Sequence, residues 1–241
     1  MTRSIEIVAF DLDDTLIRLA PNFIPEYLTR LSRRIESVFP DAAPISPAIL
    51  ASSTMMMNKE RNQERLEDFF YRDFTTRTGL GRGALEPHLT AFYRDEFPQL
   101  EFLSRPVFGA MGLLATVRAR GYRVALLTSA LFPRLAIDAR LRWAGLEGFP
   151  FDWRTSLEVV HATKPQPGYY LEAAEAGGVS PDRWLMVGND LAEDIVPAYN
   201  AGMSVYWVHG DVTDEERALV PPNTAVGPLE RVVFWLDQHA R

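Results

Sequence analysis

The sequence predicts an α/β fold, a Rossmann-like doubly wound parallel sheet, with an all-helical segment inserted after the first strand. Three observations predict it. A short apolar run, residues 5–10, stands alone near the N-terminus. A long stretch with helical periodicity and no convincing strand follows it. In the second half of the chain, short apolar runs alternate with helical patterns of about ten residues, which is typical of strands joined by crossover helices.

The first strand is expected over residues 5–10, IEIVAF, because a short β-branched and apolar run is typical of a buried parallel strand. Apolar residues at helical spacing then recur between residues 19 and 105. Prolines and the glycine-rich run at 79–83 divide this stretch into separate segments. Helical patterns lie around residues 27–38, 49–57, 66–74 and 85–97.

Strands and helices alternate after residue 106, so this part is expected to complete the sheet. In order, the pattern predicts a helix over 108–120, a strand over 123–127, a helix over 133–143, a weaker strand near 155–160, a helix over 167–176, a strand over 184–187, a helix over 191–200, a strand over 203–208 and a terminal helix over 229–239. The predicted organisation is an α/β core of residues 1–18 and 106–241, interrupted by a helical domain of residues 19–105.

The amino-acid composition excludes several classes of function. The chain has 241 residues, enough for a sizeable core, and no cysteine, which excludes disulfides, thiolate metal sites and cysteine nucleophiles. Its net charge of −7 and pI of about 5.2 argue against a general nucleic-acid surface. No signal peptide and no membrane-length apolar run is evident. We expect a cytoplasmic protein, monomer or homodimer, with neither nucleic acid nor membrane as partner.

Acidic residues directly follow the first predicted strand. Asp11, Asp13 and Asp14 lie within DLDDT, at the carboxyl end of a strand where α/β sheets bind ligands. Like charges this close repel one another and favour a bound cation. Hard carboxylate oxygens suit Mg²⁺, which takes few protein ligands. The alternative is a solvated acidic turn or helix start.

Two further candidates follow predicted strands. Thr128 and Ser129 come after the strand over 123–127, where their hydroxyls can bind a phosphate oxygen or simply cap a helix. Lys164 lies between a predicted strand and a predicted helix, just before the two prolines of HATKPQP, and is one of only two lysines among 25 basic residues. A lysine there can neutralise developing negative charge, although an exposed loop lysine is the alternative.

The fourth candidate is GNDLAED after the strand over 184–187. Gly188 allows a tight turn, and Asp190 and Asp194 lie one helical turn apart on one face. An N-capped helix with acids at its positive end is the alternative. Since all four groups follow predicted parallel strands, one crevice can hold them, and together they suit phosphoryl transfer.

The order DLDDT, Thr128, Lys164-Pro165 and GND-x-x-x-D resembles the haloacid dehalogenase-like hydrolase superfamily. The similarity covers the whole chain. It is greatest to the phosphatase branch with a helical C1-type cap, of which phosphoglycolate phosphatases are examples. The resemblance implies that residues 19–105 are the cap domain. A cap that closes over the crevice favours a small phosphorylated metabolite as substrate.

The resemblance also implies roles for single residues. Asp11 would be the nucleophile that forms an aspartyl-phosphate intermediate. Asp13 would protonate the leaving oxygen and then activate water. Thr128, Ser129 and Lys164 would bind the phosphoryl group.

The implied cofactor is Mg²⁺. Asp11, Asp190 and the backbone carbonyl of Asp13 would bind it, and Asp194 would either join them or hold the other ligands in place.

Asp13 favours cleavage of a phosphate ester, because the dehalogenase and phosphonate-cleaving branches lack an acid there. The phosphonate branch uses a cap lysine instead, for which Lys59 is the candidate. Two positions depart from the family pattern: Ser129 stands where asparagine is frequent, and His161 where glycine is frequent. A phosphomutase, or a non-catalytic protein that binds a phosphate ligand, remains an alternative to a Mg²⁺-dependent phosphatase.

Overall fold

The computed structural model describes residues 4–42, 44–210 and 212–239. Within them, the predicted α/β fold is confirmed: six parallel strands form one sheet in the order β5-β4-β1-β6-β7-β8. β1 (Ile7–Phe10) is central, between β4 (Arg123–Leu126) and β6 (Trp184–Gly188). The chain segments that leave these three strands therefore begin side by side at one edge of the sheet.

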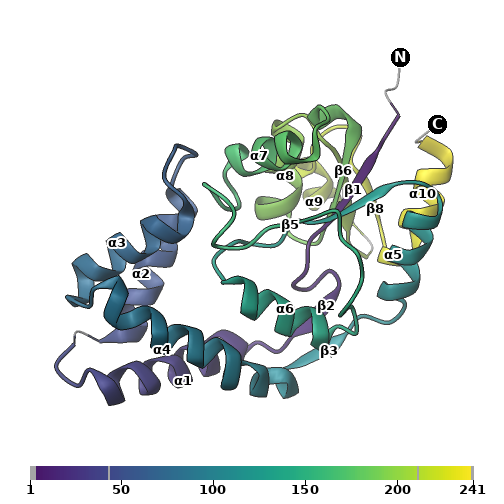
Figure 1. Ribbon diagram of the computed structural model, residues 1–241. Coiled ribbons are helices and arrows are strands. Elements are labelled where there is room, and N and C mark those ends of the chain that lie inside the picture. Colours follow the sequence, from purple (N-terminus) through teal and green to yellow (C-terminus); the bar gives the residue numbers. More distant parts are fainter. Residues whose placement is uncertain (1–3, 43, 211, 240–241) are drawn as a thin grey trace.

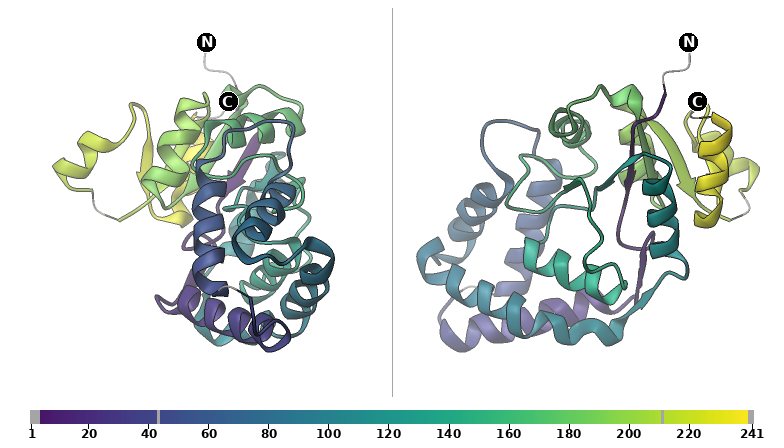
Figure 2. Two further views of the ribbon diagram at one scale, coloured as in Figure 1. Left: turned by 90° about the vertical axis from the view of Figure 1, so that its left-hand side faces the viewer. Right: turned by 45° about the vertical axis from the view of Figure 1, so that its right-hand side comes forward.

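Helices cover both faces of the sheet (Figures 1 and 2). Val8 and Phe10 of β1 pack into a core with α5 (Ala110–Ala119) and α10 (Val232–His239). The alternate residues of the strand, Ile7 and Ala9, face the core formed with α7 (Pro167–Gly177). Because both faces are buried, the strands are apolar throughout, and this is why the sequence pattern is continuous rather than alternating.

The helical segment lies beside the sheet, at the left and bottom of Figure 1. It consists of α1 (Phe23–Val38), α2 (Ile45–Asn58), α3 (Leu66–Thr78) and α4 (Arg82–Asp95), followed by the 3₁₀ helix η1 (Phe97–Leu103). Two short antiparallel strands, β2 (Ile17–Leu19) and β3 (Ser104–Pro106), pair where the chain leaves and re-enters the core.

The remaining elements complete the core. They are α6 (Arg134–Trp143), β5 (Trp153–Arg154), η2 (Pro181–Arg183), the π-helix η3 (Leu191–Ile195), α8 (Val196–Asn200), β7 (Ser204–Val208), α9 (Asp214–Leu219), β8 (Ala225–Gly227) and η4 (Leu229–Arg231). No helix formed by the described residues is long and apolar enough to cross a membrane.

Some predicted elements were wrong. The strand expected near 155–160 ends earlier, because β5 stops at Arg154 and the following residues form turns. β3 lies at the end of a stretch in which no strand was expected, and α9 and β8 were not predicted. All three are short, so they carry too little periodicity to be recognised from sequence.

Candidate active site

The four predicted motif segments meet at the carboxyl edge of the sheet. Asp11 follows β1, Thr128 follows β4, and Asn189 follows β6. The Thr15 hydroxyl donates to Asn189 Oδ1 at 2.9 Å, which ties the first and last of these loops together. The sequence placed these residues at strand ends, and the strand order β4-β1-β6 makes the three loops neighbours.

Lys164 joins two carboxylates in the interior. Its ammonium group, 1% exposed, donates to Asp11 Oδ1 at 2.6 Å and to Asp194 Oδ1 at 2.5 Å. Burial alone would lower the pKa of Lys164, but the two carboxylates outweigh it and hold that pKa well above its ordinary value. Lys164 is therefore a permanent cation of the site and not an exposed loop lysine.

The carboxylate of Asp11 is also buried. Desolvation raises its pKa, the Lys164 charge opposes that rise, and the neighbouring Asp13 adds to it. Two carboxylates, Asp11 and Asp194, thus share a single ammonium group. The site holds more negative than positive charge at this point, which is the electrostatic condition for binding a further cation.

Asp194 is packed against the backbone of the strand that precedes it. Its Oδ2 accepts the backbone N–H of Asp190 at 3.0 Å, while its Oδ1 accepts from Lys164. A Cβ at Gly188 would lie 2.3–2.5 Å from atoms of the Asp194 side chain. The sequence predicts a tight turn at this glycine, and the structure shows that it permits the close approach of Asp194. Burial raises the pKa of Asp194 to about 7, against the opposing charge of Lys164.

Asp190 is exposed, and its side chain has the helix-capping contacts that the sequence offered as the alternative. Its Oδ1 accepts the backbone N–H groups of Ala192 and Glu193, each at 2.8 Å, so it caps η3. Among the described residues, no three or more His, Cys, Asp or Glu side chains are grouped to hold a metal. Both oxygens of Asp194 already have protein partners. Asp194 therefore acts on the site by positioning Lys164 and the Asp190 backbone.

Thr128 presents an unused hydroxyl. Its backbone is held on both sides: Thr155 Oγ1 accepts the N–H of Thr128 at 3.1 Å, and Tyr169 donates to its carbonyl at 2.7 Å. Its Oγ1 is buried without a hydrogen-bond partner among the described residues. A buried unpaired hydroxyl is costly unless a ligand completes it. The neighbouring Ser129 is half-buried.

A residue that the sequence did not single out completes the site. Arg140, on α6, has no exposed side-chain surface, and its Nη1 donates to Asp13 Oδ2. Asp13 keeps 30% of its side-chain surface exposed. Desolvation raises the pKa of Asp13, and the Arg140 charge opposes that rise. In a chain with many arginines, only burial distinguishes this one, and burial of a single helical arginine is not visible in the sequence.

Lys59 and His161 have structural contacts. The Lys59 ammonium donates to His161 O at 2.7 Å, Asn62 Oδ1 at 3.0 Å and Glu64 O at 3.1 Å. His161 Nδ1 lies 2.7 Å from Glu172 Oε1. Lys59 therefore fastens the loop after α2 to the core.

The comparisons with known proteins agree on one family. The family model described as haloacid dehalogenase-like hydrolase matches residues 5–202. A glyceraldehyde 3-phosphate phosphatase of Methanothermobacter thermautotrophicus is 28% identical over 91% of this chain and 92% of its own. A phosphoserine phosphatase of Thermus thermophilus is 28% identical over 94% and 97%. The crystal structure of a 2-haloacid dehalogenase from Pseudomonas syringae superposes with a TM-score of 0.62 at 20% identity, covering 97% and 99% of the two chains.

Proposed function

This chain belongs to the haloacid dehalogenase-like hydrolase family, and from that membership we propose that it is a Mg²⁺-dependent phosphatase of a small phosphomonoester. Relatives named as phosphatases support the phosphoric monoester hydrolase reading. The fold alone does not separate phosphatases from dehalogenases, since both share it. The observation that carries the proposal is the pair of carboxylates on one loop, Asp11 held by Lys164 and Asp13 held by Arg140.

In the proposed reaction Asp11 is the nucleophile. Its carboxylate attacks phosphorus, and the P–O bond to the leaving alcohol breaks while the aspartyl-phosphate bond forms. Asp13 gives its proton to the leaving oxygen. A water molecule then attacks the aspartyl phosphate and loses a proton to Asp13, which releases inorganic phosphate and restores Asp11.

The other residues hold the transferring phosphoryl group. Lys164 supplies a fixed positive charge beside Asp11, which offsets the charge spread over the phosphoryl oxygens in the transition state. The unpaired hydroxyl of Thr128 is available to donate to one of those oxygens. Ser129 lies next to it as a second donor.

The donor set fits Mg²⁺. The available groups are hard oxygens, from Asp11, Asp190 and the carbonyl of Asp13, and one of the carboxyl oxygens of Asp13 is buried without a partner among the described residues. Mg²⁺ needs only one or two carboxylates besides water and phosphate, so a larger side-chain cluster is not required. When bound, the ion would neutralise charge on the phosphoryl oxygens. We place Asp194 beside these ligands and not among them.

Helices α1–α4 would form the cap. Contacts from the segment after α2 to the core support this part of the proposal. Besides Lys59, Arg61 forms a two-point ion pair with Glu175, with N–O distances of 2.8 and 2.6 Å. Gln166, two residues after Lys164, donates to Met57 O at 2.7 Å. The cap is thus docked next to the loop that carries the catalytic lysine, where closure can exclude water.

Phosphate release from a panel of phosphomonoesters tests the proposal, with Mg²⁺ or with EDTA. Release should require Mg²⁺ and disappear in Asp11→Asn. Asp14→Asn is the matched control, because it removes the same charge from the same loop, and its positive φ of 59° tolerates asparagine. Release that survives Asp11→Asn contradicts the assignment. Accumulation of an isomeric phosphate ester in place of inorganic phosphate would identify a phosphomutase.

A further inference from the structure

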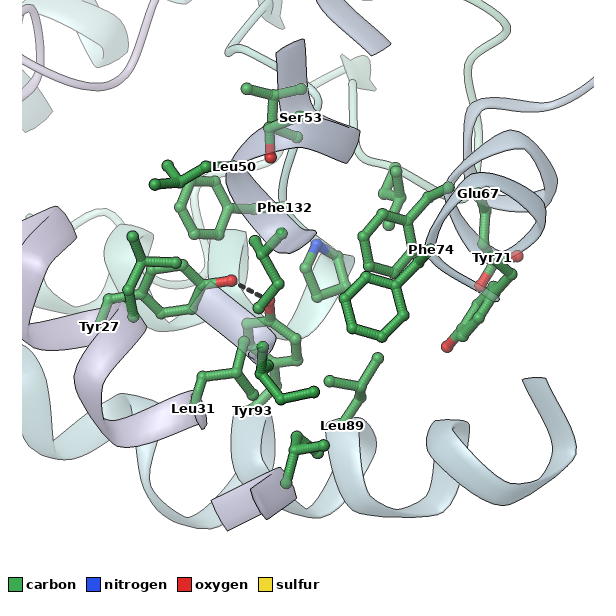
Figure 3. Close-up of a pocket in the computed structure, with 18 of the residues that line it drawn as sticks. Tyr27, Leu31, Leu50, Ser53, Glu67, Tyr71, Phe74, Leu89, Tyr93 and Phe132 are labelled. Carbon is green, nitrogen blue, oxygen red and sulfur yellow. Dashed lines mark hydrogen bonds between the residues drawn. The ribbon is translucent and has the colours of Figure 1, made fainter. Parts of the chain in front are cut away.

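A large apolar cavity lies between the helical segment and the core segments that follow β4 and β5 (Figure 3). Its volume is about 510 Å³, within the range of small-molecule sites. Leu31, Phe74 and Leu89 are among the apolar side chains that surround it. Of the exposed large hydrophobic residues, Ile24, Leu50 and Leu135 lie on its wall.

The described side chains that line the cavity include acidic but no basic residues. Among the described residues that line it, none is lysine, arginine or histidine. Two of its hydroxyls, those of Tyr27 and Tyr93, lie 2.7 Å apart and bond to one another. A ligand that carries a second carboxylate or phosphate would leave that charge without a partner in an apolar space.

The acidic residues on its wall outnumber their cationic partners. Glu67 and Glu86 both contact Arg82, at 3.2 and 3.0 Å. Glu158 accepts the backbone N–H of Arg134 with both carboxyl oxygens, at 2.9 and 3.0 Å. Glu67 and Glu86 thus share one arginine, and Glu158 is held by a backbone N–H alone, so the wall carries more negative than positive charge. The cavity therefore disfavours a second anionic group and fits an apolar body.

A chain of contacts connects the cavity to the reacting groups. Phe132, four residues after Thr128, lines the cavity, and its ring centroid lies 5.3 Å from that of Tyr27. The Arg140 guanidinium lies over the Phe132 ring, with its carbon 4.5 Å from the ring centroid, and donates to Asp13. The wall of the cavity and the carboxylate that protonates the leaving oxygen are thus separated by one arginine side chain.

We propose that the organic group esterified to phosphate in the substrate is a mainly apolar alkyl or aryl body, without a second anionic group, that occupies this cavity. The proposal rests on the phosphatase function proposed above and narrows its substrate class. It predicts discrimination against esters with a second anionic group, such as phosphoglycolate and O-phosphoserine. Their extra carboxylate would face a wall of apolar side chains and carboxylates.

A homologous series of esters tests this. We expect kcat/KM to rise about threefold to fourfold per methylene from ethyl to hexyl phosphate, because each buried methylene adds a nearly constant transfer free energy. The kcat/KM values for phosphoglycolate and O-phosphoserine should be at least about tenfold lower than the value for hexyl phosphate. A kcat/KM that is flat along the series, or higher for either anionic ester, overturns the proposal and leaves the phosphatase assignment intact.

Binding of unreactive phosphonates separates the two proposals. Hexylphosphonate should bind the Mg²⁺-loaded protein at least about tenfold more tightly than ethylphosphonate in calorimetry. Equal binding, or binding of neither compound, overturns the cavity proposal. If no ester is hydrolysed but hexylphosphonate still binds more tightly, the phosphatase assignment fails. The cavity would then bind an apolar group that is not part of a hydrolysed substrate.

Two variants locate the effect. Ser53→Phe fills the cavity from α2 and should abolish the preference for hexylphosphonate without weakening ethylphosphonate. Met55→Phe is the control, on the same helix, exposed and outside the cavity wall. Should Ser53→Phe fail to fold, Leu50→Lys at the half-exposed rim places a cation at the mouth. It should improve kcat/KM for phosphoglycolate relative to hexyl phosphate. If this ratio does not change, the proposal is contradicted.

Discussion

The fully buried guanidinium of Arg140 donates a hydrogen bond to the carboxylate of Asp13, 127 positions away in the sequence. Its other terminal nitrogen, Nη2, is buried without a partner among the described residues. Arg140 also packs on Phe132, so the contacts of α6 fix the orientation of the carboxylate. We assign Arg140 as a positioning residue that keeps the Asp13 carboxyl group in the same orientation while it first donates and then accepts a proton.

Replacing Arg140 by methionine should therefore reduce turnover in a way that depends on the leaving group. We expect kcat to fall at least about tenfold for an alkyl phosphate, whose leaving oxygen needs a proton, and much less for 4-nitrophenyl phosphate. Arg142→Met, exposed on the same helix, is the control. Equal losses with both esters would indicate that Arg140 has only a structural role.

The two lysines of the chain should differ in effect. Lys164→Met leaves the carboxylates of Asp11 and Asp194 buried without their cation, so we expect loss of activity by at least about 10³-fold, together with a lower melting temperature. Lys59→Met removes backbone contacts between the loop after α2 and the core. It should raise KM and leave kcat within about threefold. Steady-state kinetics and thermal melts of both variants check this; a large fall in kcat for Lys59→Met would refute the docking role.

Gly188→Ala should disable the site through Asp194. The added Cβ would lie 2.3–2.5 Å from the Asp194 side chain, so that carboxylate must move away from Lys164. We expect a destabilisation of about 1–3 kcal/mol, typical of overpacking, and a large loss of activity. Gly112→Ala is the control: nothing lies within 4 Å of its added Cβ, and alanine favours the helix α5. Chemical denaturation of both variants measures the difference, and a fully stable, active Gly188→Ala would contradict it.

Thr128→Val should separate stability from function. The two side chains have the same shape, and the buried hydroxyl has no protein partner to lose. We therefore expect the melting temperature to stay constant or rise, while kcat/KM falls about tenfold because a donor to the phosphoryl group is missing. Thr155→Val is the contrasting case. The Thr155 hydroxyl bonds to the backbone of Thr128, so its removal should lower the melting temperature. Unchanged kinetics in Thr128→Val would remove this residue from the site.

Sequence reasoning located most of the site because its residues follow strands. The position of Asp11 after an apolar run, and of Asp190 after another, is local information that needs only hydrophobic periodicity. Arg140 could not be found this way. Its role depends on α6 packing under the first loop, a long-range contact with no local signal.

The sequence by itself determined the α/β class, the helical insertion and the order of the four motifs, because strand burial and helix periodicity are properties of short segments. Only the tertiary structure decided how the charges are shared. In the folded chain Lys164 lies between Asp11 and Asp194, Arg140 pairs with Asp13, and Lys59 donates to backbone carbonyls. The tertiary structure also created the apolar cavity, because a cavity is the space left between packed helices and no single segment encodes it.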